Sequence, residues 1–207
     1  MSPLGKAGVF ASLGPLPFMG LAPVFLVGTY DESGRPNIMA AAMGGLCCVQ
    51  PPCLAVSIEK SAWTMPSLEQ RKAFTINVAS SSMAAQLDFC GLVSGRDGNK
   101  FSALGLTPLV GDHVDAPYVA ECPVVVELLL RHVLPMGSHT QYVGEIMDVK
   151  VRQECLTSEG EPDPRRIDAM TFFPLRGEYY GTGNFVARAL AVGKTIMRLD
   201  DDKLGKS

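Results

Sequence analysis

The sequence predicts a mainly β protein built on an antiparallel sheet or barrel, with a few peripheral helices. Two observations lead to this prediction. Short apolar runs rich in Val, Ile and Phe recur along the chain, for example at 24–30 and 74–78, as is typical of strands. Several successive runs are joined by short turns. Strands joined in this way pair antiparallel, because parallel pairing needs a long crossover.

The first two predicted strands enclose a turn and differ in side-chain size. The run at 24–30 is followed by turn residues at 31–34. The second run contains Ala40, Ala41 and Ala42 and ends at two glycines. A strand with such small side chains leaves room for a flat ligand, or for another backbone, to approach closely.

The middle of the chain is predicted to contain two helices between strands. The expected elements are, in order, a strand at 54–58, a helix at 64–72, a strand at 74–78, a helix from the serines at 80–82 to near 91, a polar loop at 94–100, one helical turn, and an irregular stretch at 110–119. Thr64 is expected to cap the first helix. In the second helix, Met83, Leu87 and Cys90 fall on one face and predict the side that is buried.

Two long strands dominate the second half of the chain. The run at 124–134 is apolar except at Glu127, Arg131 and His132, which predicts burial on both faces. A connection at 135–139 leads to a strand at 140–152. Beyond it, 159–164 is the clearest surface loop, and the tail after Lys194 is expected to be a frayed helix.

Length and composition indicate one folded domain. Of 207 residues, 47% are hydrophobic and 19% are charged, which is enough for a large core and excludes wholesale disorder. We expect a single domain over 1–207, with a core at about 13–185, an extended N-terminal arm and a frayed C-terminal tail. The net charge of −3 gives no electrostatic reason to expect a nucleic-acid partner.

Two further features of the sequence indicate the cellular compartment in which the protein is expected. Residues 7–30 carry no charge, but three prolines interrupt this stretch, so a membrane span is disfavoured. Because the core is ample and no cleavable signal is evident, the six cysteines are expected to be reduced thiols in the cytoplasm. The adjacent Cys47 and Cys48 can form only a strained disulfide with each other, so burial as small apolar side chains is favoured.

Several motifs of major enzyme classes are missing. No G-x-G-x-x-G follows a strand, which disfavours a Rossmann dinucleotide site, and no G-x-S-x-G frames a serine nucleophile. There is no C-x-x-C, and the histidines at 113, 132 and 139 are widely spaced. No metal site is therefore predicted.

A series of short segments carries a family resemblance: 24–29, 31–37, Met39, Ala41, Ala42, Gly44, Gly45, Pro51, Pro52, 56–57, 74–77, 93–97, 100–101, 105–108, 115–118, 137–141 and 144–146. In order and spacing, they resemble the flavin reductase-like family with the FMN-binding split-barrel fold, and within it the flavoredoxins of anaerobic bacteria. The match covers about 13–152. The resemblance implies a six-stranded antiparallel Greek-key barrel, a homodimer, and noncovalent FMN near the dimer interface.

The resemblance also implies how the FMN phosphate is held. This group carries about −1.5 to −2 charges and needs cations or N–H donors. The residues expected to supply them are Lys60, Ser61, Thr64, Ser94, Gly95 and Lys100. Thr64 would act at a helix start, where free amides favour an anion. The alternative is that Thr64 only caps its helix and that the lysines are solvated.

The isoalloxazine ring needs a shallow apolar slot with hydrogen-bond donors at its edge. The residues expected around it are Asn37, Met39, Ala40, Ala41, Ala42, Met43, Ser57, Trp63, Asn77 and Phe101. For Asn37 and Asn77 the alternative is anchoring of a loop, and for Trp63 it is packing. Met43 and Glu59 depart from the family, in which tryptophan and a basic residue are common at these positions.

His139 is the candidate catalytic residue. In the family, the histidine of the matching segment lies close to the flavin side of the barrel. There it would orient a nicotinamide or hydrogen-bond the flavin rim. The alternative is a structural bond to a backbone carbonyl in the loop before a strand.

Three functional hypotheses follow. The first is an NAD(P)H-dependent FMN reductase, in which NADH or NADPH is the electron donor. The second is a flavoredoxin-type protein that keeps FMN bound and exchanges electrons with redox proteins. The third is a β-barrel interaction module without a flavin.

Overall fold

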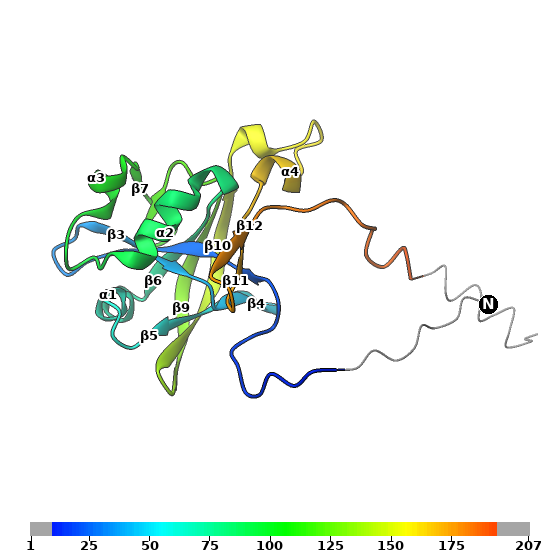
Figure 1. Ribbon diagram of the computed structural model, residues 1–207. Coiled ribbons are helices and arrows are strands. Elements are labelled where there is room, and N and C mark those ends of the chain that lie inside the picture. Colours follow the sequence, from blue (N-terminus) through cyan, green and yellow to red (C-terminus); the bar gives the residue numbers. More distant parts are fainter. Residues whose placement is uncertain (1–9, 194–207) are drawn as a thin grey trace, which may run out of the picture.

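The computed structural model describes residues 10–193, and its centre is one antiparallel sheet of seven strands (Figure 1). The strands lie in the order β3 (Pro36–Ala41), β2 (Phe25–Tyr30), β6 (Ala73–Val78), β9 (Val124–Met136), β10 (His139–Val151), β5 (Pro52–Glu59) and β4 (Gly44–Val49). The mainly β, antiparallel fold class is confirmed. The sheet has one strand more than the six expected.

The outermost strands of this order, β3 and β4, are consecutive in the chain and separated only by Ala42 and Met43. At this corner the backbone N–H of Ser57 donates a hydrogen bond of 2.7 Å to the carbonyl of Met43. The end of β3 therefore lies beside β5, and the sheet curls towards closure here. The Ala42–Met43 corner is also where the site described below begins.

The strand β4 was missed because its side chains do not alternate in the way that a half-buried strand requires. Leu46 is 78% exposed and Val49 is 91% exposed. The expectation that Cys47 and Cys48 are buried is wrong for the same reason, because both lie on this exposed strand.

The core has two parts, and β2 separates them. Phe25 and Val27 belong to an apolar cluster with residues of β5, β6, β9 and β10, whereas Leu26 belongs to a second cluster that includes residues of α2 (Ala84–Leu92). Successive side chains of a strand point to opposite faces, so β2 is buried on both sides. The helix α2 thus covers the outer face of β2 and β3.

The two long strands form a hairpin whose turn is only two residues long, so both strands reach into the connection that was predicted at 135–139. The first part of β9 is buried, but residues 131–136 are exposed. The expectation of burial on both faces is wrong for this part, because the tip of the hairpin projects beyond the barrel (Figure 1).

The predicted helices are present as α1 (Thr64–Arg71) and α2, which follows a 3₁₀ turn at Ser81–Met83. Met83, Leu87 and Cys90 are buried, as their common face predicted. The capping prediction is wrong: Thr64 is the first helical residue, and no side chain caps α1. No side chain caps α2 either.

Shorter elements complete the described chain. They are α3 (Lys100–Leu104), β7 (Pro108–Val110), β8 (Pro117–Val119), a 3₁₀ turn at Gln153–Cys155, α4 (Pro164–Ile167), and a small sheet of β1 (Ala22–Pro23), β11 (Thr171–Phe173) and β12 (Glu178–Tyr180). The hairpin of β7 and β8 occupies part of the stretch expected to be irregular. Residues 10–21 contain no helix or strand and lead away from the barrel (Figure 1). The predicted helix after Lys194 lies outside the described residues.

Gly28 lies where the barrel leaves no room for a Cβ atom, and substitution at this position tests the packing. A Cβ at this position would lie 2.3 Å from the carbonyl oxygen of Pro117 and 2.3 Å from Oγ1 of Thr75. We expect Gly28→Ala to lower the free energy of unfolding by about 3 kcal/mol, because such overpacking forces the backbone to move. Urea unfolding measures the change. Gly183→Ala is the matched control, since nothing lies within 4 Å of the added Cβ, and an equal effect of both variants would contradict the packing described.

Candidate functional site

A cleft of about 430 Å³ opens at the corner between β3 and β5. Three parts of the chain that are far apart in sequence form its walls: the end of β3 with the Ala42–Met43 corner, the end of β5 with the start of α1, and the end of α2 with the loop after it. Its lining residues are Met39, Ala40, Ala41, Ala42, Met43, Ser57, Ile58, Glu59, Ser61, Ala62, Trp63, Thr64, Cys90, Gly91, Leu92, Val93, Ser94, Gly95, Lys100 and His139.

The wall formed by β3 is made of small side chains. Ala40 and Ala42 pack towards the cluster that contains α2, whereas Ala41 packs towards the barrel interior. A Cβ at Gly91 would lie 3.6 Å from the Cβ of Ala40, so β3 and the end of α2 approach each other with very little side chain between them. The strand that was predicted to leave room for a flat ligand therefore lines the cleft.

Lys100 is the cation in this cleft, and it is only 3% exposed. Its Nζ donates a hydrogen bond of 3.0 Å to the carbonyl of Cys90, which uses one of three N–H groups. No carboxylate among residues 10–193 lies within ion-pair distance of it. Burial lowers the pKa of Lys100, and the nearby Cys90 and Asp97 oppose this shift only in part. The geometry leaves a buried ammonium group with unused donors.

The Cys90 thiol is a weak acid in this setting. Burial raises its pKa to about 11, and the positive charge of Lys100 opposes the rise. Near neutral pH the thiol therefore stays protonated, and it does not neutralise the ammonium group beside it.

The start of α1 forms the polar end of the cleft. Asn37 lies behind it and donates a hydrogen bond of 3.2 Å to the hydroxyl of Thr64. No side chain caps α1, and of its first three residues Pro66 has no N–H and Met65 donates its N–H to the carbonyl of Ala62 at 3.2 Å. The backbone N–H of Thr64 is therefore the one that remains available to an anion. The indole Nε1 of Trp63 is buried and has no hydrogen-bond partner among the described residues.

The loop after α2 packs onto this helix start. A Cβ at Gly95 would lie 2.4 Å from Oδ1 of Asn37 and 2.8 Å from Cδ1 of Trp63, so this position requires glycine. The guanidinium of Arg96 lies 5.2 Å from the centre of the Trp63 ring, where the ring attracts a cation. The loop and the helix start thus form one polar wall.

His139 is the first residue of β10 and faces the cleft from the β5 side, where Glu59 is its strand partner. Its Nδ1 lies 2.8 Å from the hydroxyl oxygen of Ser138. Among residues 10–193, no backbone carbonyl is found hydrogen-bonded to this ring. The imidazole is oriented by its neighbour and lines the cleft.

Four of the predicted contacts do not line the cleft. Asn77 is buried in the barrel, where its side chain binds the backbone of Leu26 in β2 and of Val119 in β8. Phe101 packs in the core, Asn37 reaches only the back of Thr64, and Lys60 faces a neighbouring hollow. That hollow has a volume of about 640 Å³, and Arg96 and Trp63 also line it.

Sequence reasoning missed seven lining residues: Ile58, Glu59, Ala62, Cys90, Gly91, Leu92 and Val93. Glu59 had been noticed only as a departure from the family. Ile58, Ala62 and Val93 lie beside predicted residues in the chain. No local pattern indicated that the end of α2, with Cys90, Gly91 and Leu92, turns towards β3.

Fold and cleft together define the class: this is a split-barrel protein whose cleft lies at the corner where the barrel closes. The chain belongs to the flavin reductase-like domain family, whose model matches residues 21–173. Among residues 10–193, no helix has the length and apolar character needed to cross a membrane.

Two solved structures and one sequence relative illustrate the similarity. Flavoredoxin of Desulfovibrio vulgaris (Miyazaki F) is 48% identical with a TM-score of 0.86, covering 89% of this chain and 100% of that one. Flavoredoxin from Methanosarcina acetivorans is 26% identical with a TM-score of 0.82, covering 93% and 100%. The uncharacterized protein YddH of Escherichia coli is 35% identical over 100 residues, which are 48% of this chain. The match spans about half of YddH, 53% of its length.

Proposed function

We propose that the chain binds FMN in the cleft between β3, α1 and α2 and uses it in electron transfer of the NAD(P)H:flavin reductase type. The observation that carries the proposal is the pairing of an alanine wall with a buried, unneutralised Lys100 in one cleft. Family membership and the similarity to flavoredoxins support it.

The residues present fit the two ends of FMN. Lys100, the backbone N–H of Thr64 and the hydroxyls of Ser61 and Ser94 offer the donors that a phosphate requires. The small side chains of β3 let a flat ring lie against the backbone, and the orphaned indole N–H of Trp63 is a further donor beside the cleft. When bound, FMN supplies the redox chemistry, and the chain supplies binding, orientation and limited access of water.

His139 is proposed to orient the electron donor. Its ring is half-buried and lines the cleft, and the Ser138 hydroxyl at Nδ1 fixes its direction. No further acid, base or nucleophile is required, because the protein has only to hold donor and acceptor in a reactive geometry.

A second candidate function is flavoredoxin-type electron transfer, in which FMN stays bound and electrons are exchanged with redox proteins. The 48% identity to a flavoredoxin over 89% of this chain favours it. The cleft is the same in both functions, and the difference lies in the electron donor.

A titration of the full chain with FMN tests the shared part of the proposal. We expect saturable quenching of flavin fluorescence and a flavin absorption band that stays with the protein on gel filtration. No uptake of FMN would contradict it. Stopped-flow mixing of the complex with NADH or NADPH then separates the candidates: bleaching supports the reductase, and its absence together with reduction by a redox protein supports the second function.

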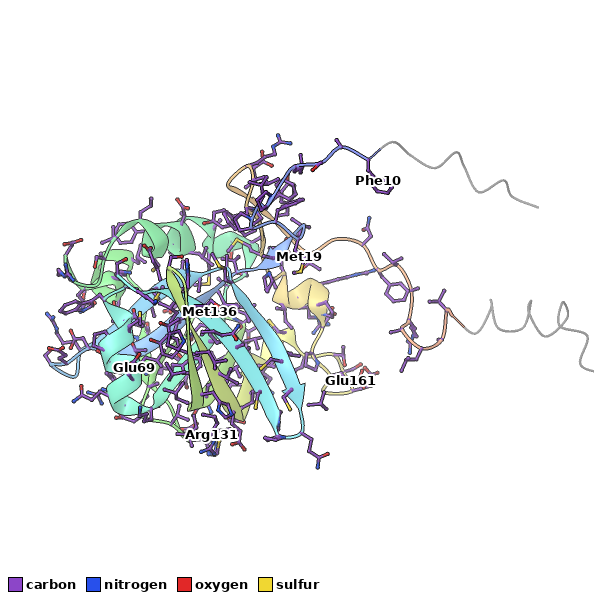
Figure 2. All side chains as sticks on the ribbon, turned by 90° about the horizontal axis from the view of Figure 1, so that it is seen from below. Phe10, Met19, Glu69, Arg131, Met136 and Glu161 are labelled. Atoms are coloured by element: carbon purple, nitrogen blue, oxygen red, sulfur yellow. The ribbon has the colours of Figure 1, made fainter. Side chains whose placement is uncertain are left out.

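The proposed assembly is a homodimer in the cytoplasm. On the N-terminal segment Phe10 is 97% exposed and Met19 is 89% exposed, and Figure 2 shows Phe10 far from the barrel. Apolar side chains in such positions are typical of a segment that a partner covers. Light scattering is expected to give twice the 22.1 kDa of one chain, and a mass of one chain at micromolar concentration would contradict the dimer.

A further inference from the structure

Three of the six cysteines gather on the hairpin of β4 and β5, at the end away from the cleft. Cys47 and Cys48 are exposed, and Cys53 is buried. None of them lines the cleft, and the proposed flavin chemistry does not use them. From Met43 at the cleft, Cys48 is five residues further along the chain, roughly 16 Å at the rise of a strand.

The register of the hairpin places Cys48 directly opposite Cys53. Facing residues of antiparallel strands have Cα atoms about 4.5–5.5 Å apart, within the range of about 4.4–6.8 Å that disulfides span. Residues that face each other in this way project their side chains from the same face of the sheet. Cys47 has no strand partner, because the register shifts between Leu46 and Cys48.

The two facing thiols differ in environment. Burial raises the pKa of the Cys53 thiol, and the neighbouring Cys48, Cys47 and Glu145 raise it further. Its Sγ also lies 3.4 Å from the carbonyl of Pro51, to which it donates. Cys48, in contrast, is open to solvent and borders an apolar groove of about 430 Å³ with Leu46 and Val49. Reagents thus reach Cys48 before Cys53, which lies opposite it in the hairpin.

We propose that Cys48 and Cys53 form a reversible dithiol–disulfide pair that undergoes exchange with a disulfide of another molecule. The thiolate of Cys48 attacks one sulfur of that disulfide, which breaks its S–S bond and releases one thiolate. Cys53 then loses its proton and attacks Sγ of Cys48, which forms the intramolecular disulfide and releases the second thiolate. The two cysteines give up two electrons and two protons, and the external disulfide is reduced to two thiols.

Oxidised glutathione is the probe for this exchange, used on the full chain with and without FMN. After incubation, free thiols are blocked with N-ethylmaleimide under denaturing conditions and the chain is analysed by mass spectrometry. We expect blocked thiols to fall from six to four, a peptide cross-link between Cys48 and Cys53, and complete reversal by dithiothreitol. Six free thiols, or a cross-link between Cys47 and Cys48, would overturn the proposal.

Three single variants assign the roles. Cys53→Ser is expected to accumulate one glutathione adduct on Cys48, because the second attack is missing. Cys48→Ser is expected to lose both adduct and cross-link, whereas Cys47→Ser, the matched neighbour, keeps the cross-link. Loss of the cross-link in Cys47→Ser alone would show that the wrong pair was assigned. The cross-link itself is mapped in the chain without substitutions, so poor folding of a variant does not invalidate the test. The test also does not depend on flavin binding.

Discussion

Ala42→Phe is expected to weaken FMN binding by at least about 100-fold, or roughly 2.8 kcal/mol. Ala42 is half-buried and lines the cleft at the corner of β3 and β4. A phenyl group there occupies the space that we assign to the ring, and the surrounding walls are too closely packed to move aside. Ala42→Val is expected to give an intermediate loss. Fluorescence titration with FMN measures both.

Ala103→Phe is the matched control for this prediction. Ala103 lies on α3, is exposed and does not line the cleft, so the same enlargement should leave FMN affinity unchanged. Thermal unfolding of the three variants without flavin separates a blocked cleft from a damaged fold. If Ala42→Phe folds normally and binds FMN as tightly as the unaltered chain, the ring lies elsewhere.

Lys100→Met is expected to weaken FMN binding by about 10- to 100-fold, because charge-assisted hydrogen bonds contribute roughly 1.5–3 kcal/mol. Riboflavin, which lacks the phosphate, serves as the internal comparison. Its affinity should change little, since the ammonium group is assigned to the phosphate and not to the ring. Arg165→Met removes one positive charge far from the cleft and controls for net charge. Lys60→Met should have a smaller effect than Lys100→Met, because Lys60 faces the neighbouring hollow.

The same lysine gives FMN affinity a pH dependence with a definite sign. In the free protein, burial lowers the pKa of Lys100, whereas a bound phosphate would favour the protonated form and raise the pKa again. Above the lowered pKa of Lys100 in the free protein, the complex therefore binds more protons than the free protein and free FMN do together. Affinity should be greatest below that pKa and should decline as the pH rises through it. Titrations above pH 8, where the phosphate no longer titrates, test this decline, which Lys100→Met should abolish.

The strands and helix faces that depend on local sequence pattern were predicted well. Strands β2, β5 and β6 follow from short apolar runs, and the buried face of α2 follows from the spacing of Met83, Leu87 and Cys90. The missed strand β4 has no alternation to detect, because most of its side chains are exposed. Its pairing with β5, and not its own composition, makes it a strand.

The site was harder to predict because its contacts are long-range. Asn77 was assigned to the cofactor, yet its Oδ1 accepts a hydrogen bond from the backbone N–H of Val119, which is 42 residues away in the chain. An asparagine suits either role, and local sequence does not distinguish them. The predicted alanine wall, Trp63 and Lys100 do meet at one cleft, whereas the contribution from the end of α2 depends on how that helix packs onto β3.

The cleft is assembled from three distant stretches of chain, and this affects how quickly the protein is degraded. An unfolded chain holds none of these stretches together, so a molecule that occupies the cleft adds its binding free energy to the native state alone. At one hundred times its dissociation constant this amounts to about 2.7 kcal/mol. Cofactor supply would then set how often the barrel opens and how quickly proteases remove it, and abundance in a cell would follow flavin status without any change in gene expression.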